Sequence, residues 1–221
     1  MAEQSITVDK DRAVLLLVDI QPDFMPGGAL PVPEGHAIVE PVRSMMASPV
    51  FRHLAATQDW HPPGHVSFAS SHEGKKPFDE IRLYGHQQTL WSDHCVQGSE
   101  GAQLHSAIPW DKVSVIVRKG MDKDCDSYSG FRNNWNPAGE RPPTGLAGYL
   151  RERGIETVFC CGLARDVCVK WTAQDAAEAG FHTYFLWDLT RPVDASSDER
   201  VRADLRQRGV QITSSGALVA M

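Results

Sequence analysis

A cysteine lies where a strand-like run turns into a helical pattern. The apolar stretch "IETVFCC" (155–161) is followed by "GLARDVC" (162–168), which leads into the helical "VKWTAQDAAEAG". Cys168 therefore falls in the first turn of the predicted helix, where unpaired N–H groups and the helix dipole favour negative charge and lower the pKa of a thiol. The position suits a nucleophile, but a thiol that only fills the core would show the same pattern.

Three charged residues follow or end apolar runs elsewhere in the chain, namely Asp19, Asp59 and Lys119. In open α/β sheets, ligands bind beyond the carboxyl ends of the strands, so these side chains are expected near Cys168. A carboxylate there can take the proton of the thiol, and a lysine can balance the charge. Taken singly, each of the three could equally be a charge that solvates a loop.

A metal site is the second kind of chemistry that the residues suggest. In "QDWHPPGH" (58–65), Asp59 and His61 are two residues apart on an extended segment, so their side chains can face the same way. One carboxylate and two imidazoles make a ligand set with open positions, and it accepts Zn²⁺, Fe²⁺ or Mn²⁺. The residues alone leave the third ligand open among His65, His72, His86 and His94. The remaining histidines, His36, His53, His105 and His182, have the pattern of ordinary surface or packing residues.

The elements that must position these side chains alternate between strands and helices. Short apolar runs predict strands at 12–20, 51–60, 112–120, 155–162 and 181–189. Amphipathic patterns predict helices at 143–154, 166–180 and 196–209, the last with Ser196 and Glu199 at capping-box spacing. This alternation predicts an α/β fold, a parallel sheet in a three-layer α/β/α arrangement.

Length and composition fit one domain spanning residues 1–221. The chain has 221 residues, of which 42% are apolar, and the aperiodic stretch at about 61–110 is expected to be a functional loop for metal and substrate. The net charge of −6 and the lack of a basic run exclude nucleic acid as the expected partner. A polar N-terminus and apolar runs too short to span a bilayer predict neither a signal peptide nor membrane insertion, hence a cytoplasmic location. Five cysteines at low density predict reduced thiols.

Several blocks together resemble the nicotinamidase (pyrazinamidase) branch of the isochorismatase-like hydrolases. The resemblance runs from about residue 12 to 190, with the blocks in the family's order. They are "LLLVDIQPDFMPGGALPV" (15–32), "QDWHPPGHVSFASSH" (58–72), "LWSDHCVQGSEGAQLH" (90–105), "VRKG" (117–120), "DSYSGF" (126–131) and "GLARDVCVKWTAQDA" (162–176). The resemblance implies a six-stranded parallel sheet and an amidohydrolase that converts nicotinamide, and also pyrazinamide, to the acid and ammonia.

The resemblance also implies the roles of particular residues. It carries a Cys–Asp–Lys triad onto Cys168, Asp19 and Lys119. It places a cis peptide at 163–164 and an oxyanion hole at the backbone N–H groups of Ala164 and Cys168. Phe24, Trp91, Tyr128 and Leu163 are the substrate-binding residues that it implies.

One divalent metal ion is implied as well, bound by Asp59, His61 and His94, with His65 as an alternative ligand. Zinc is the first choice, and iron or manganese are the others. The expected partner is the small-molecule substrate nicotinamide. A homo-oligomer is compatible with the family, whose members vary in this respect.

Two departures from the family pattern bear on substrate range. Arg165 replaces the threonine frequent after "GLA", and "WDLTRPVD" (187–194) replaces the commoner "DACRG". We expect Arg165 near the pocket rim, where it would alter access or accept a related amide. The alternative functions are a cysteine amidase acting on another small amide, such as a carbamoyl or ureido compound, a hydrolase using metal-bound water, and a catalytically silent binder.

Overall fold

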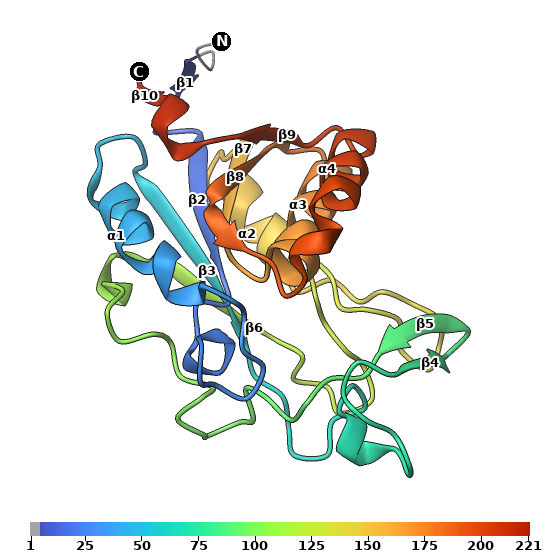
Figure 1. Ribbon diagram of the computed structural model, residues 1–221. Helices are drawn as coiled ribbons and strands as arrows, with labels where there is room; N and C mark the ends of the chain where they lie inside the picture. The colour runs from blue at the N-terminus through green and yellow to red at the C-terminus, as the bar shows by residue number, and fades with distance from the viewer. Residues whose placement is uncertain (1–4) are drawn as a thin grey trace.

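The computed structural model describes residues 5–221 and is built around a six-stranded parallel sheet with the strand order β6-β3-β2-β7-β8-β9 (Figure 1). Its strands are β2 (Ala13–Val18), β3 (His53–Asp59), β6 (Val115–Lys119), β7 (Thr157–Leu163), β8 (His182–Arg191) and β9 (Gln211–Thr213). The five predicted strands correspond to β2, β3, β6, β7 and β8, and the expected six-stranded parallel sheet is confirmed. The short strand β9 was not predicted.

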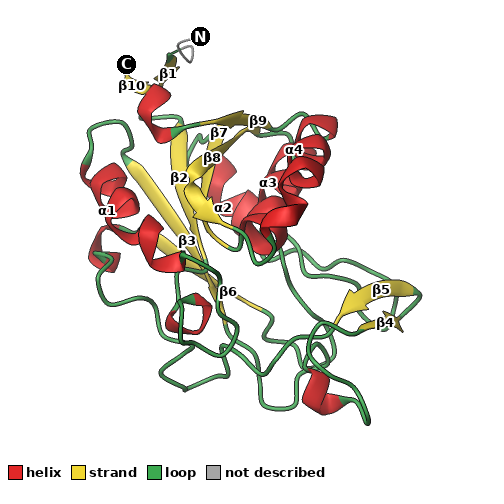
Figure 2. Cartoon of the chain, viewed as in Figure 1, coloured by secondary structure: helices red, strands yellow, loops and turns green. Residues whose placement is uncertain are grey.

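Helices cover both faces of this sheet and form the expected three layers (Figure 2). They are α1 (Val39–Ala47), α2 (Leu146–Glu152), α3 (Lys170–Glu178) and α4 (Asp198–Gln207). Helix α1 lies on one face, and α2, α3 and α4 lie on the other. The sequence did not predict α1, which carries Pro41 in its first turn, where the missing N–H of proline costs no helical hydrogen bond.

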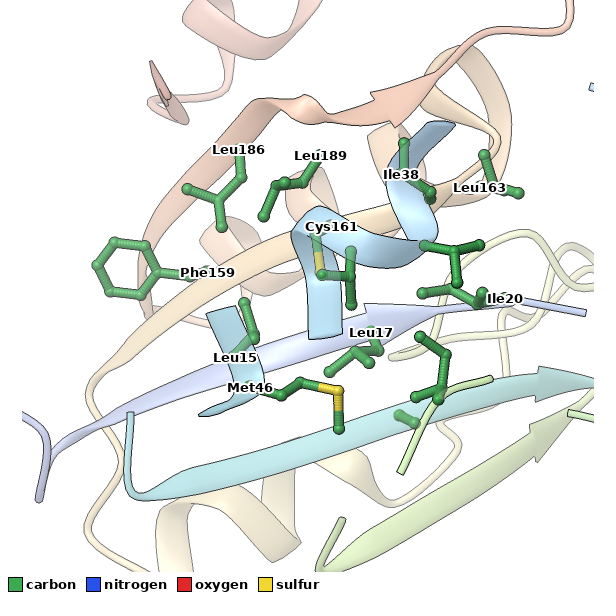
Figure 3. Packing of buried hydrophobic residues seen from close by; sticks show 14 of the residues in the cluster. Leu15, Leu17, Ile20, Ile38, Met46, Phe159, Cys161, Leu163, Leu186 and Leu189 are labelled. Carbon is green, nitrogen blue, oxygen red and sulfur yellow. The ribbon is translucent and has the colours of Figure 1, made fainter. Parts of the chain in front are cut away.

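The sheet separates two apolar cores because neighbouring residues on a strand point to opposite faces. Leu15, Leu17 and Cys161 pack under α1, in the cluster shown in Figure 3. Leu16 and Cys160 pack on the opposite side, under α2, α3 and α4. Cys160 and Cys161 therefore fill different cores, which accounts for two adjacent, fully buried thiols.

Two predicted helices begin differently from expectation. Residues Arg165–Val169 form a π-helical turn before α3, in which the Val169 N–H donates to the Ala164 carbonyl at 3.0 Å. Before α4, the Asp194 side chain accepts from the Ser196 N–H at 2.9 Å and caps a short 3₁₀ turn. The predicted capping box of Ser196 and Glu199 is therefore wrong, because Asp194 takes the capping role two residues earlier.

The long stretch at 61–110 is ordered around a hairpin. Its strands β4 (Glu80–Leu83) and β5 (His86–Thr89) pair antiparallel, away from the main sheet (Figure 1). A further pair, β1 (Ile6–Val8) and β10 (Leu218–Ala220), brings the two ends of the described chain together. Within residues 5–221, no helix is both long and apolar enough to cross a bilayer.

Candidate active site

The site lies at the carboxyl ends of the central strands, at the point between β2 and β7 where the order of the strands along the chain reverses. From β2 the chain adds β3 and β6 on one side and then returns to place β7 and β8 on the other. Ligands bind at such a switch point because the connections leave on opposite faces and open a crevice. Asp19 follows β2, Asp59 ends β3, Lys119 ends β6, and Cys168 follows β7, all of them buried.

Two glycines permit close approaches at this edge. A Cβ on Gly162 (φ +117°) would lie 2.1 Å from the Val18 carbonyl oxygen, so no larger residue fits between β2 and β7. A Cβ on Gly120 would lie 2.3 Å from the ring of His61. Glycine at these positions lets the strand ends and the imidazole pack together.

Lys119 is the centre of the charged residues. Its Nζ lies 2.9 Å from Asp19 Oδ2 and 2.5 Å from Asp59 Oδ1, and it also donates to the Ser127 carbonyl oxygen at 2.9 Å. Burial alone would lower the pKa of Lys119, but Asp19 and Asp59 hold this pKa well above its usual value. A charged ammonium is thereby kept in a site closed to solvent.

Asp19 has one engaged and one available carboxylate oxygen. Oδ1 accepts a hydrogen bond from Thr57 Oγ1 at 2.7 Å. Oδ2 forms the ion pair with Lys119 but, among the described residues, receives no hydrogen bond of regular geometry. Burial raises the pKa of Asp19, and the neighbouring Asp59 adds to the rise. A carboxylate with a raised pKa accepts a proton more readily, as a general base requires.

Cys168 lies against this carboxylate and the ammonium. Its Sγ is 3.6 Å from Lys119 Nζ, and Sγ lies within 4.8 Å of a carboxylate oxygen of Asp19 and of Asp59. Burial raises the pKa of Cys168 well above its usual value, and Lys119 opposes the rise. The expectation of a lowered pKa was therefore wrong for the free site, because loss of solvent outweighs the helix start.

Asp59, His61 and His94 form a group suited to a metal ion. Nε2 of His61 and Nε2 of His94 lie 3.4 and 3.7 Å from Asp59 Oδ2. The opposite ring nitrogens face backbone carbonyls, with Nδ1 of His61 3.1 Å from the Gly120 oxygen and Nδ1 of His94 2.7 Å from the Ser92 oxygen. Donation to those carbonyls fixes the tautomer and turns the Nε2 lone pairs toward Asp59, which is the arrangement of metal-bound histidines.

The protonation of Asp59 also suits a cation. Burial acts to raise its pKa, but Lys119 and His61 outweigh burial and hold the pKa of Asp59 well below the usual value. The carboxylate is therefore charged and ready to bind a cation. The donor set of one carboxylate and two imidazoles fits a divalent ion of the zinc, iron or manganese type.

Among the candidate third ligands in the described residues, His94 is the one grouped with both Asp59 and His61, whereas His65 is grouped with His61 and Asp126. His65 packs on His61, with ring centroids 4.3 Å apart, but its Nδ1 faces Ser67 Oγ at 2.7 Å and its Nε2 faces the Cys125 oxygen at 3.3 Å. His72 is bonded to the Val66 carbonyl, and His86 stacks on Trp135. Both ring nitrogens of His65 are thus engaged within the protein.

A pocket opens onto both Cys168 and the group formed by Asp59, His61 and His94. Its lining includes Cys168 and Ala164, the metal-type group, and the predicted aromatic residues Phe24, Trp91 and Tyr128. The Trp91 Nε1–H donates to Tyr128 Oη at 3.3 Å, and Gln88 donates to the same oxygen at 2.9 Å, which holds two of the aromatic walls in place.

Leu163 does not share this placement. Its side chain is fully buried in the core cluster under α1 (Figure 3), since the alternation along β7 turns it away from the pocket. The peptide bond between Leu163 and Ala164 is cis, as the resemblance implied.

Several residues at the site were not identified from the sequence as functional. Thr57 bonds Asp19, and Ser127 offers its carbonyl to Lys119. The fully buried amide of Gln21 bridges strand ends, donating to the Asp59 carbonyl at 2.9 Å and accepting from the Asp59 N–H at 2.7 Å. Val193 forms part of the pocket wall. The sequence offered one signal for two of these residues: Thr57 and Gln21 are polar and stand within or next to apolar strand-like runs, where a buried polar side chain needs a specific partner.

Arg165 points away from the pocket, so the expectation that it lies at the rim is wrong. It is only 6% exposed and binds Asp198 and Thr190 behind the turn that carries Cys168. A buried guanidinium requires several acceptors, and these lie on β8 and at the start of α4. The two departures from the family pattern therefore contact each other, since Arg165 binds residues of the segment 187–194.

Fold and site together define a three-layer α/β protein with a buried cysteine, a carboxylate and a lysine at the switch point of a parallel sheet. The isochorismatase domain model matches residues 13–217, and the chain belongs to the isochorismatase family. Among curated relatives, it is 42% identical to a nicotinamidase of Acinetobacter baylyi over 93% of this chain and 94% of the relative.

Solved structures agree with this placement. The nicotinamidase/pyrazinamidase of Acinetobacter baumannii has a TM-score of 0.87 at 39% identity, over 93% of this chain and 97% of that one. The L. infantum protein PnC1, solved with nicotinate, has a TM-score of 0.85 at 39% identity, over 98% and 100%. The pyrazinamidase of Pyrococcus horikoshii, solved with zinc, has a TM-score of 0.72 at 34% identity, over 92% and 99%.

Proposed function

We propose that this protein hydrolyses the carboxamide of nicotinamide to nicotinate and ammonia, and that it acts on pyrazinamide in the same way. The observation that carries the proposal is the placement of the Cys168 thiol, which lies beside Asp19 and Lys119 and opens into an aromatic pocket next to a metal-type group. The relatives named nicotinamidase and the neighbour solved with nicotinate support this substrate.

The first half of the reaction forms a thioester. Asp19 takes the proton from the Cys168 thiol as sulfur attacks the carboxamide carbon, and the carbonyl electron pair moves onto oxygen. Lys119 remains charged and offsets the negative charge that passes through the site. When the tetrahedral intermediate collapses, the C–N bond breaks and Asp19 returns its proton to the leaving ammonia.

The second half consumes one water molecule. Asp19 removes a proton from the water as the water oxygen attacks the thioester. The C–S bond then breaks, Asp19 returns its proton to the leaving Cys168 sulfur, and the nicotinic acid loses its proton to solvent to give nicotinate. In both halves the backbone N–H groups of Ala164 and Cys168 would bind the oxyanion. Ala164 precedes the π-helical turn and Cys168 lies within it, and the first N–H groups of a helical turn lack partners inside it. Losing one such donor costs about 3–4 kcal/mol in comparable sites.

Asp59, His61 and His94 would hold one divalent metal ion, with zinc as the first choice and iron or manganese as alternatives. When bound, the ion supplies an open coordination position that takes the pyridine nitrogen and so fixes the carboxamide over Cys168. The zinc in the Pyrococcus horikoshii relative supports this assignment. The rings of Phe24 and Trp91 would pack on the substrate from the pocket walls.

Ammonia release is the test. The purified protein, supplied with zinc, is incubated with nicotinamide, and ammonia and nicotinate are quantified together. Equal amounts of both products, absent from a Cys168→Ala control, are expected. No release from nicotinamide, or equal release by the control, would refute the proposal.

A further inference from the structure

Two consecutive side chains tie the turn that carries Cys168 to a distant part of the chain. Arg165 and Asp166 open the π-helical turn Arg165–Val169, here called the nucleophile turn. Both side chains reach residues 187–198, here called the wall segment, which runs from the end of β8 to the start of α4. The nucleophile and one pocket wall are therefore held to a common support.

Arg165 uses its whole guanidinium for this contact. Nη1 donates to both carboxylate oxygens of Asp198, at 2.8 and 3.0 Å. Nε donates to Thr190 Oγ1 at 2.9 Å, and Nη2 donates to the Thr190 carbonyl at 2.8 Å. The group also lies over the Trp187 ring, 4.1 Å from its centroid. Such a planar fork with several acceptors fixes both position and orientation.

Asp166 holds the part of the wall segment that lies between the residues bound by Arg165. Its carboxylate accepts from the Val193 N–H at 2.9 Å, from the Asp194 N–H at 2.9 Å and from Ser197 Oγ at 3.3 Å. The Val193 side chain lines the pocket together with Val167 and Cys168. The carboxylate of Asp166 therefore sets where this wall of the pocket stands.

We propose that Arg165 and Asp166 are two positioning residues with separate effects, an inference that rests on the proposed function. Arg165 fixes the nucleophile turn and so the place of Sγ and of the oxyanion-binding N–H groups. Asp166 fixes Val193 and so the fit of the pocket around the pyridine ring. Neither side chain is among those that line the pocket, so both act through the residues that they hold.

The two roles predict different kinetic changes. In Arg165→Lys the charge remains but the fork is lost, and because a shift of about 1 Å at the reacting atoms can cost 10²-fold, kcat should fall by about 10- to 10²-fold with little change in KM. In Asp166→Asn at least one of the two N–H groups loses its acceptor. The KM for nicotinamide should then rise by about tenfold, the loss of roughly one hydrogen bond to a charged group, with kcat nearly unchanged.

A matched control is the other bidentate pair of the same helical layer. Arg141 donates to Asp175 at 2.7 and 3.1 Å and to the Asn133 carbonyl, and among the described residues its guanidinium makes no hydrogen bond to the nucleophile turn. Arg141→Lys should lower the melting temperature about as much as Arg165→Lys and leave kcat and KM as in the parent protein. If Arg165→Lys does not fold, Asp198→Asn provides a milder change with a smaller fall in kcat.

The experiment measures kcat and KM for nicotinamide, and the Kd of nicotinate by calorimetry, on the zinc-loaded parent, Arg165→Lys, Asp166→Asn and Arg141→Lys. A fall confined to kcat in the first variant, and weaker binding of both nicotinamide and nicotinate in the second, are expected. Changes that match those of Arg141→Lys, or that move kcat and KM together in both variants, would overturn the proposal. Nicotinate binds without being converted. If the proposed reaction failed, the Kd of nicotinate for Asp166→Asn would therefore still test the role of Asp166.

Discussion

Two buried clusters of polar side chains share the carboxyl edge of the sheet and differ in how their atoms are bound. The first is Asp19 with Lys119 and Cys168. Within the described part of the chain, Oδ2 of Asp19 receives no regular hydrogen bond, and this carboxylate lies next to the thiol. The second, Asp59 with His61 and His94, has each imidazole fixed by a backbone carbonyl. The 2.5 Å contact between Lys119 and Asp59 joins them.

The difference indicates that the two clusters have separate functions. In the first cluster, burial raises the pKa of both the Asp19 carboxyl and the Cys168 thiol, so a proton can pass between the two groups. A cluster with a lowered carboxyl pKa and locked tautomers keeps its lone pairs in place and is suited to hold an ion. We therefore expect damage to the first cluster to remove chemistry and damage to the second to remove substrate positioning.

The largest expected effect is in the first cluster. Cys168→Ala should lower turnover by about 10⁶-fold, as loss of a nucleophile does in a concerted site. Its melting temperature should stay near that of the parent, which a thermal scan checks. Activity within tenfold of the parent would exclude the thioester mechanism.

Asp19→Asn should come next, with a loss of about 10⁴-fold, the scale seen when the acidic member of a catalytic unit is removed. The amide has the same shape and can still bond Thr57, but it cannot take the thiol proton. Rapid-quench measurement of nicotinate formation gives kcat directly. The neighbouring Thr57→Val serves as the comparison, since it removes only the hydrogen bond to Oδ1 and should cost far less.

In the second cluster, the expected effect is on substrate choice. Benzamide has the carboxamide but no ring nitrogen, and a site built around a polar contact can reject such an analogue by about 10⁴-fold. Chelation, or His94→Ala, should erase most of this preference along with most of the activity. Competition between nicotinamide and benzamide, with and without zinc, measures this preference. Parent protein that hydrolyses benzamide within tenfold of nicotinamide would show that the second cluster has another purpose.

Outside both clusters, the thiols should matter only for stability. Cys160→Ala and Cys161→Ala leave small voids in separate cores and should each cost about 1 kcal/mol of unfolding free energy. Chemical denaturation gives this number, and kcat should match the parent. A loss of turnover beyond the loss of folded protein would place a second thiol in the reaction.

Much of this site could be predicted from the sequence because parallel strands bring their ends to one edge. Asp19, Asp59 and Lys119 were found as charges at the ends of apolar runs, a pattern that a buried sheet imposes. The choice of His94 among four histidines came from the family resemblance, since the residues alone carried no signal for it. The strand β9 has three residues, too few to show a clear period. Helix α1 was missed because a proline within a helical pattern indicates a break unless it lies in the first turn, as Pro41 does.

Other features depend on tertiary contacts that the sequence does not display. The direction of Arg165 is set by acceptors on Thr190 and Asp198, which are far from it along the chain. The pKa of Cys168 is raised by burial, which a helix-start argument does not include. Likewise, the family resemblance implied that Leu163 binds substrate, whereas the strand turns its side chain into the core.

The most direct test of the account is to trap its covalent intermediate. Zinc-loaded protein is mixed with nicotinamide, quenched in acid within the first turnover, and digested for peptide mass spectrometry. A nicotinoyl group on the peptide that contains Cys168, decaying as nicotinate appears and absent from Cys168→Ala, is the predicted result. The account would be contradicted if nicotinamide were fully turned over with no acyl group on Cys168 at any quench time, and if the Cys168→Ala protein kept this activity.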